Sequence, residues 1–238
     1  MSAAPPAAGA GFLRAPTLEA ASRGPGGVVR LSGAAPADAI VRLVAPEGRA
    51  TGVTADAQGR WTAELPPGDV PRLFALSAET AGRTLRGEGA LAVLPPGAVA
   101  VALIARAGAP SAPAAGSAPG ALRLSAVDFD AGGGLAAAGT APAGAALRLL
   151  ADGAAAGAGQ ADASGRFTLL GVGAPLAPGA HRVRVEAAAS AAEAVVDTAP
   201  AAPLSAAFRA ARTAVGWRVD WARPGGGVQS LFAPDAPR

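Results

Sequence analysis

The chain repeats itself once, without a gap, at an offset of 106 residues. Residues 33–62 align with residues 139–168, and 15 of the 30 aligned positions are identical. A unit that recurs at about domain spacing in a chain of 238 residues favours two domains of ordinary size. The repeat therefore predicts that one fold occurs twice along the chain.

The identities gather at turns and at residues suited to a core. Asp56-Ala57-Gln58-Gly59 matches Asp162-Ala163-Ser164-Gly165. The Asp side chain can cap a turn, and the Gly can take the left-handed conformation that closes a hairpin. An aromatic residue, Trp61 or Phe167, follows two residues after each Gly. We expect these two aromatic side chains to anchor the two cores.

The apolar residues alternate with a period of two, which is typical of half-buried strands. Val41 and Leu43 flank Arg42, and the second copy has the same alternation around Arg148. The 33 Gly and 22 Pro residues interrupt any long helix at about 1 to 3 kcal/mol each. The sequence therefore predicts an all-β protein with two tandem immunoglobulin-like β-sandwich domains, a Pro/Gly/Ala linker and a C-terminal β-hairpin.

Composition shifts along the chain predict where the domains begin and end. We expect a disordered N-terminus at residues 1–10, the first domain at residues 11–106 and a semi-flexible linker at residues 107–120. The second domain is expected at residues 121–199, and the C-terminal tail at residues 200–238.

The tail carries the residues that we select as candidate ligand contacts. Residues 216–232 predict a hairpin with a Gly-rich turn, which must pack on the second domain or on a partner. Trp217, Trp221 and Phe232 are candidates for stacking on sugar rings or for anchoring a partner. The alternative, which the sequence favours, is that these aromatic side chains pack onto the sandwich.

Composition excludes several kinds of function. The chain has no Cys, which removes disulfides, thiolate catalysis and Cys-based zinc sites. Its single His, His181, rules out metal sites built from several His residues. All 20 basic residues are Arg, the formal charge is +3, and neither half of the chain is a basic block. The sequence therefore predicts no cofactor, no metal and no nucleic-acid partner.

Two small groups of residues are compatible with chemistry, and each has a simpler interpretation. His181 is the only imidazole available to a catalytic triad, but its place between a turn and a strand favours an exposed structural residue. Asp128 and Asp130 are compatible with a calcium site, or with the polar face of a strand and the turn after it. With no Gly-x-Ser-x-Gly motif in the chain, we predict no catalytic residues and no enzymatic activity.

The sequence shows no membrane span and no export signal. The longest strongly apolar run, at residues 98–105, has eight residues, far short of the roughly 18 that a spanning helix needs. The first residues lack the basic and apolar regions of a secretory signal. If Met1 is the true start, these features predict a cytoplasmic location.

The second copy resembles the bacterial Ig-like domains of alphaproteobacterial envelope proteins that often carry a LysM peptidoglycan-binding domain. The resemblance lies in Val127-Asp128-Phe129-Asp130, Gly139-Thr140-Ala141-Pro142-Ala143-Gly144-Ala145, Asp152-Gly153, Ala161-Asp162-Ala163-Ser164-Gly165-Arg166-Phe167 and Leu176-Ala177-Pro178-Gly179-Ala180-His181-Arg182-Val183-Arg184-Val185. The first copy shows the pattern in part, with Asp38 in place of a Gly and without the Pro-Gly-x-His turn.

The resemblance implies a function as well as a fold. It implies a non-catalytic structural or interaction module of the bacterial periplasm or cell envelope, with an envelope protein or a glycan as partner. The chain contains no recognisable LysM sequence, so peptidoglycan attachment cannot be transferred residue by residue. The alternative function is a carbohydrate- or peptidoglycan-binding module that uses the C-terminal aromatic residues.

Overall fold

The computed structural model describes residues 13–114, 120–172, 175–223 and 226–237, which form nineteen β-strands and one short 3-10 turn. The first half contains β1 (Thr17–Arg23), the 3-10 turn (Pro25–Gly27), β2 (Val29–Ala34), β3 (Ile40–Val44), β4 (Ala50–Thr54), β5 (Arg60–Leu65), β6 (Arg72–Thr80), β7 (Arg83–Val93), β8 (Ala102–Arg106) and β9 (Ala109–Pro113). The second half contains β10 (Arg123–Asp130), β11 (Leu135–Thr140), β12 (Ala146–Ala151), β13 (Ala154–Gln160), β14 (Arg166–Leu170), β15 (Ala180–Ala187), β16 (Ser190–Asp197), β17 (Phe208–Arg212), β18 (Gly216–Ala222) and β19 (Val228–Pro234).

The two copies of the repeat have one strand topology. In the first, β1-β2-β5 form one sheet and β4-β3-β6-β7 belong to the other. In the second, β10-β11-β14 lie in one sheet and β13-β12-β15-β16 form the other. The first, second and fifth strands thus face the fourth, third, sixth and seventh, as in immunoglobulin-like sandwiches. The prediction of two tandem immunoglobulin-like domains is confirmed.

Each domain encloses its own hydrophobic core, and the repeated aromatic residue lies in it. Trp61 on β5 and Phe167 on β14 are each 2% exposed. The preceding turns also match: Asp56 Oδ1 accepts the Arg60 backbone N–H at 2.8 Å, and Asp162 Oδ1 accepts that of Arg166 at 3.0 Å. The predicted capped turns and core anchors are therefore confirmed in both copies.

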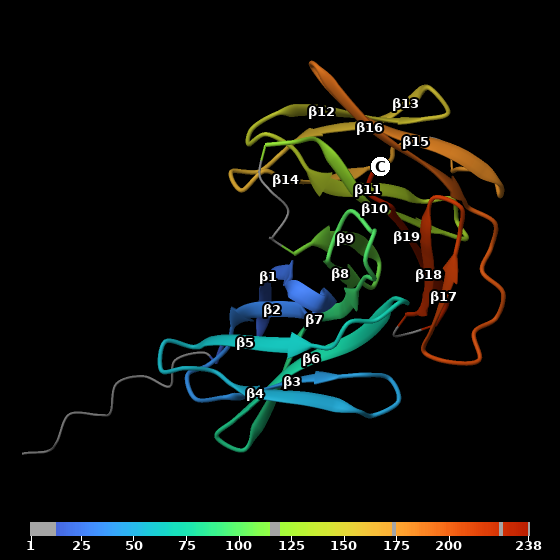
Figure 1. The fold of residues 1–238 in the computed structure, drawn as a ribbon. Helices are drawn as coiled ribbons and strands as arrows, with labels where there is room; N and C mark the ends of the chain where they lie inside the picture. Colours follow the sequence, from blue (N-terminus) through green and yellow to red (C-terminus); the bar gives the residue numbers. More distant parts are fainter. Residues whose placement is uncertain (1–12, 115–119, 173–174, 224–225, 238) are drawn as a thin grey trace, which may run out of the picture.

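Each domain also carries strands that the other lacks. β8 and β9 extend the larger sheet of domain 1 to the order β4-β3-β6-β7-β8-β9. The tail extends the β14-β11-β10 sheet of domain 2 with β19, β18 and β17, which Figure 1 shows in red beside β10. The predicted hairpin is β18 and β19, which pair from Gly216 and Pro234 to Ala222 and Val228. It packs on domain 2 as part of its sheet.

The segment expected as a linker contains a strand. Residues 107–120 include β9, which pairs with β8 from Leu103 and Pro113 to Arg106 and Ala109. Proline is compatible with this strand because β9 lies at the edge of its sheet, where an absent N–H interrupts no ladder. The expectation of a semi-flexible linker is therefore wrong for residues 109–113. Residues 115–119, and the N-terminal residues expected to be disordered, lie outside the described residues.

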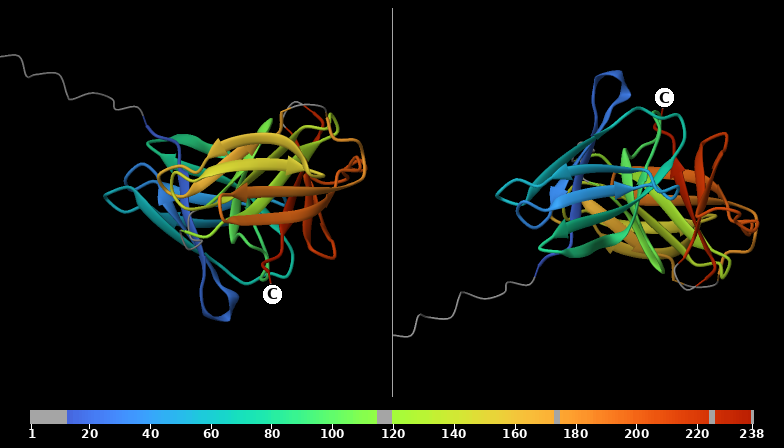
Figure 2. Two further views of the ribbon diagram at one scale, coloured as in Figure 1. Left: turned by 90° about the horizontal axis from the view of Figure 1, so that it is seen from above. Right: turned by 90° about the horizontal axis from the view of Figure 1, so that it is seen from below.

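A third core joins the two domains. Alternate residues of β8 point to opposite sides: Ala102 and Ile104 pack in the core of domain 1, whereas Leu103 and Ala105 pack against domain 2. Figure 2 shows the strands of the two domains lying against each other from above and from below. None of the described segments forms a helix long and apolar enough to cross a membrane.

Candidate interaction site at the domain junction

The junction between the domains contains a third cluster of buried apolar residues, in addition to the two sandwich cores. Its apolar centre consists of twelve buried residues from both domains: Leu73, Ala92, Leu94, Ala100, Leu103, Ala105, Ala126, Ala138, Val219, Trp221, Leu231 and Ala233. Small residues on β10 and β11 let the two sheets approach closely, and larger side chains come from β8 and the tail. The tail strands therefore contribute to the interface between the domains.

The structure separates the three aromatic residues selected from the sequence. Trp221 is 5% exposed in the junction core, and Phe232 is 2% exposed in the core of domain 2. Only Trp217 is half-buried at the surface, where the Arg212 guanidinium lies 5.5 Å from the centre of its ring. The three side chains do not form one exposed surface, because Trp221 and Phe232 are buried in different cores. A ligand role for these residues stays a prediction.

Trp217 lines a pocket of about 400 Å³ that both domains form. Pro95 comes from domain 1, and Asp235 from the end of the tail. The Asp235 carboxylate accepts hydrogen bonds from Arg212 at 2.6 and 3.1 Å, which holds the guanidinium over the indole. This ion pair fixes one face of the Trp217 ring.

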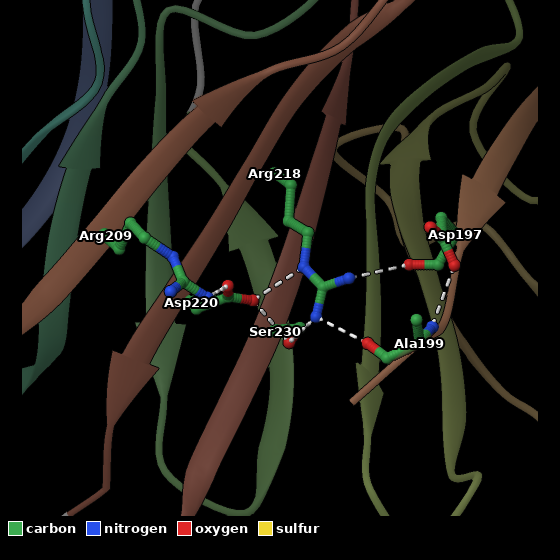
Figure 3. Close-up of polar contacts among 6 residues, drawn as sticks. All are labelled: Asp197, Ala199, Arg209, Arg218, Asp220 and Ser230. Carbon is green, nitrogen blue, oxygen red and sulfur yellow. Dashed lines mark hydrogen bonds and ion pairs between the residues drawn. The ribbon is translucent and has the colours of Figure 1, made fainter. Parts of the chain in front are cut away.

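A buried carboxylate fastens the tail strands to each other and to the end of domain 2 (Figure 3). Asp220 on β18 accepts hydrogen bonds from Arg218 Nε at 2.8 Å, Arg209 Nη2 at 2.7 Å and Ser230 Oγ at 2.7 Å. Arg218 also donates to the backbone oxygens of Asp197 and Ala199, at 3.1 and 2.8 Å. These bonds join all three tail strands to the chain that leaves β16.

The Asp220 side chain is only 2% exposed, yet it stays ionised. Burial by itself raises the pKa of this carboxyl group, but the hydrogen bonds from Arg218, Arg209 and Ser230 together outweigh burial and lower its pKa. The cluster satisfies the buried charge, so it can hold the strands in register. The Arg218 guanidinium also lies 5.2 Å from the centre of the Phe129 ring.

A second buried carboxylate binds the β8–β9 hairpin to domain 2. Asp128 on β10 accepts the Ser111 backbone N–H at 2.8 Å and the Ser111 hydroxyl at 2.7 Å. Gln229 on β19 accepts the Gly108 N–H at 3.1 Å and donates to the Ala109 carbonyl at 3.2 Å. The segment expected as a linker is thus held to both β10 and β19.

The hydrogen bonds that Asp128 and Asp130 accept argue against a calcium site at these two residues. Asp128 is buried and its oxygens accept bonds from Ser111, whereas Asp130 accepts the N–H groups of Gly132 and Gly134 at 2.9 and 3.1 Å. Within the described residues, no group of three or more His, Cys, Asp or Glu side chains is placed to hold a metal ion. Burial raises the pKa of Asp128 to about 6, although the Ser111 hydrogen bonds act in the opposite direction.

His181 lies on β15, in the sheet of domain 2 that the tail strands do not join. Its Nδ1 lies 2.6 Å from Asp152 Oδ2, and its Nε2 lies 2.7 Å from the Ala177 carbonyl oxygen. The hydrogen bond with Asp152, followed by that with Ala177, raises the pKa of His181. Both ring nitrogens are engaged with acceptors, so neither is free to take a proton from a hydroxyl nucleophile. The geometry favours the structural interpretation of His181.

Sequence reasoning missed Asp128 as a member of the junction, and Asp220 and Arg218 as the pair that fastens the tail to domain 2. The signal was present in β18, where Arg218 and Asp220 alternate with Trp217, Val219 and Trp221. Such alternation is typical of a strand with one face packed on a core and the other exposed to solvent. Here the polar face is covered by the chain between β16 and β17.

No protein-family model and no curated protein matches the chain. Solved structures match it at low identity. The D0-D1 domain of intimin is 13% identical, with a TM-score of 0.28, 76% of this chain and 96% of that chain covered. The BSP domain of a biofilm-associated protein is also 13% identical, with a TM-score of 0.27 and 79% of this chain covered. This chain spans about 30% of the length of that biofilm-associated chain.

A third match is the central fibronectin-III array of RIM-binding protein. It is 19% identical, with a TM-score of 0.26, 89% of this chain and 74% of that chain covered. TM-scores of 0.26 to 0.28 carry no argument about the fold of this chain. They have no bearing on ligand, partner or activity.

Proposed function

We propose that this chain is a non-catalytic structural or interaction module of the bacterial cell envelope, in which two immunoglobulin-like domains act as one rigid body. The observation that carries the proposal is the third core, because Leu103 and Ala105 of domain 1 are buried against Val219 and Leu231 of the tail. Interfaces between mobile domains are more polar and less tightly buried. A rigid pair suits a protein that spaces or presents a surface.

Two further observations support a structural role. The repeated residues are turn and core residues, so what the chain duplicates is a scaffold. The two buried carboxylates, Asp128 and Asp220, are hydrogen-bonded to neighbouring strands. The envelope location rests on the resemblance of the repeated motifs to bacterial Ig-like domains, and the partner would be an envelope protein or a glycan.

Residual dipolar couplings measured by NMR test the rigid-body part of the proposal. One alignment tensor is expected to fit the amide couplings of both domains. Leu103→Asp puts a charge into the junction core and should allow the two domains to move independently. This variant is the reference for a mobile pair, and its couplings are expected to need two tensors. Two tensors for the wild-type chain would refute the rigid spacer.

Cell fractionation tests the location separately. In the organism that encodes the chain, an antibody against the protein is expected to detect it in the periplasmic or envelope fraction. A cytoplasmic enzyme and a periplasmic enzyme serve as fractionation markers. Recovery with the cytoplasmic marker would reject the envelope role and leave the rigid-body result unaffected.

A further inference from the structure

A pocket of about 540 Å³ lies where the end of domain 1 meets the tail. Its walls are mainly apolar: Leu65, Val70 and Phe74 come from domain 1, and Phe208 comes from β17 of the tail. Its volume falls within the roughly 300–1,000 Å³ that is typical of small-molecule sites, which combine apolar walls with a few polar groups. Val70 is 55% exposed and leaves the entrance apolar.

One cation in this pocket has a donor without a partner. Arg72 donates from Nη2 to the Pro66 carbonyl at 2.8 Å, and its guanidinium lies 5.9 Å from the centre of the Phe74 ring. Its Nε is buried and has no hydrogen-bond partner among the described residues. Arg72 forms no ion pair with any carboxylate in the described part of the chain. A buried donor left unsatisfied costs about 1–3 kcal/mol.

A second arginine increases this cost. Burial, and then the positive charge of Arg23, lower the pKa of Arg72. Arg23 donates to the carbonyl oxygens of Leu94 and Gly27, at 2.8 and 3.5 Å, and no carboxylate of the described residues pairs with it. These two neighbouring cations thus have no carboxylate partner among the described residues, and an anion bound at the Arg72 guanidinium from the pocket would relieve their repulsion.

We propose that this pocket binds an amphiphilic monocarboxylate, with its headgroup on Arg72 and its apolar chain against Val70, Phe74 and Phe208. The walls favour an apolar chain over a bare inorganic anion, because only one arginine in the pocket is without an acid partner. The other, Arg49, pairs with Glu47 at 2.9 Å at the rim. The site is independent of the proposed envelope role, since it depends on the pocket alone.

Gly68 lies against Arg72 outside the pocket lining, so a side chain there would move the guanidinium. A Cβ on Gly68 would lie 3.2 Å from Arg72 Nε and 3.3 Å from its Cζ. Gly68 does not have a positive φ, so Ala fits its backbone conformation. Gly68→Ala therefore retains the charge of Arg72 while displacing its guanidinium from the pocket wall.

The test is isothermal titration calorimetry of the full chain with octanoate, octanol and inorganic phosphate. Octanoate is expected to bind, with octanol and phosphate at least tenfold weaker. Arg72→Gln and Gly68→Ala are each expected to weaken octanoate binding at least tenfold. Arg49→Gln, which removes an equally charged side chain that is 87% exposed at the rim, is expected to change it less than twofold.

Circular dichroism verifies that each variant folds, and Gly68→Ala keeps the proposal testable if Arg72→Gln does not. Octanol binding equal to octanoate would overturn the role of Arg72, and phosphate binding equal to octanoate would overturn the role of the apolar walls. Octanoate affinity that is unchanged in both variants, or absent from the wild type, would overturn the site itself.

Discussion

Gly139 lies directly opposite Phe167 across the β11–β14 ladder, and a Cβ on this glycine would approach the Phe167 ring at 2.8 Å. The first domain repeats the relationship: Gly33 lies opposite Trp61, whose ring would be 3.0 Å from the added Cβ. In each copy the missing side chain of the glycine leaves the space that the aromatic ring of the core occupies. This explains why both members of the pair were retained in the repeat.

We predict that Gly139→Ala destabilises the protein by about 2 kcal/mol or more, because the methyl group meets the Phe167 ring and the Arg123 backbone carbonyl. Urea unfolding followed by circular dichroism measures the change. Gly52→Ala is the matched control, since Gly52 also lies in a strand but a Cβ there meets nothing closer than 3.9 Å. Equal losses from the two substitutions would contradict the steric explanation.

The local features of the fold were predictable because they depend on residues close in the sequence. Asp56 and Gly59 form their turn within five residues, and the alternation around Arg42 specifies a strand without reference to its partner. The same holds for β18 and β19, whose hairpin is formed by neighbouring strands. Because the two copies align, each local prediction made for one domain also applied to the other.

The junction was not predictable because its members are far apart in the sequence. Ser111 meets Asp128 only after β9 has joined its sheet, and Gly108 meets Gln229 across more than one hundred residues. The Pro- and Ala-rich composition around β9 is also that of a linker. Edge position and buried hydrogen bonds order this segment, and neither is visible in the composition.

Leu103→Ala tests the energy of the third core. The side chain is fully buried in the junction, so its loss is expected to cost about 2–4 kcal/mol. Ile104→Ala, one residue along β8, is the control, because it faces the core of domain 1. NMR couplings should show loosened domains for Leu103→Ala and not for Ile104→Ala. The same result for both would mean that the junction does not depend on this side chain.

Removing the buried carboxylate of Asp220 is expected to be strongly destabilising. Asp220→Ala leaves Arg218, whose side chain is 15% exposed, without its charge partner, which costs about 3–5 kcal/mol. Arg209→Gln is expected to cost less than about 1 kcal/mol, since that side chain is 42% exposed and Arg218 still neutralises the carboxylate. Thermal unfolding distinguishes the two. A small effect of Asp220→Ala would show that the cluster does not fasten the tail.

Asp128 should make the junction less stable as the pH rises. Its pKa is raised to about 6 in the folded protein from 3.8, so the stabilisation present below pH 3.8 is lost as the pH rises through 6. Unfolding free energies from pH 4 to 7 measure this loss, which is at most about 3 kcal/mol. Asp128→Asn is expected to flatten the profile. Ser111→Ala, which removes a donor to the ionised form, should instead move the transition to higher pH.

The three tryptophans differ in burial, which allows Trp217 to be observed by itself. Trp61 and Trp221 are buried, so acrylamide is expected to quench mainly Trp217, and Trp217→Phe should remove most of that quenching. Trp221→Phe is the matched control and should leave the quenching intact. Strong residual quenching in Trp217→Phe would mean that the tail opens away from domain 1.

The same measurement tests the ligand role predicted for the tail aromatics. With Trp221 and Phe232 buried, a soluble peptidoglycan fragment or other glycan can stack only on Trp217, whose ring has one face covered by Arg212. A bound glycan is therefore expected to shield Trp217 from acrylamide, and Arg212→Gln should alter that shielding because it releases the indole from its ion-paired neighbour. Unchanged quenching at saturating glycan would remove all three residues as glycan contacts, while the junction they help to build would stand.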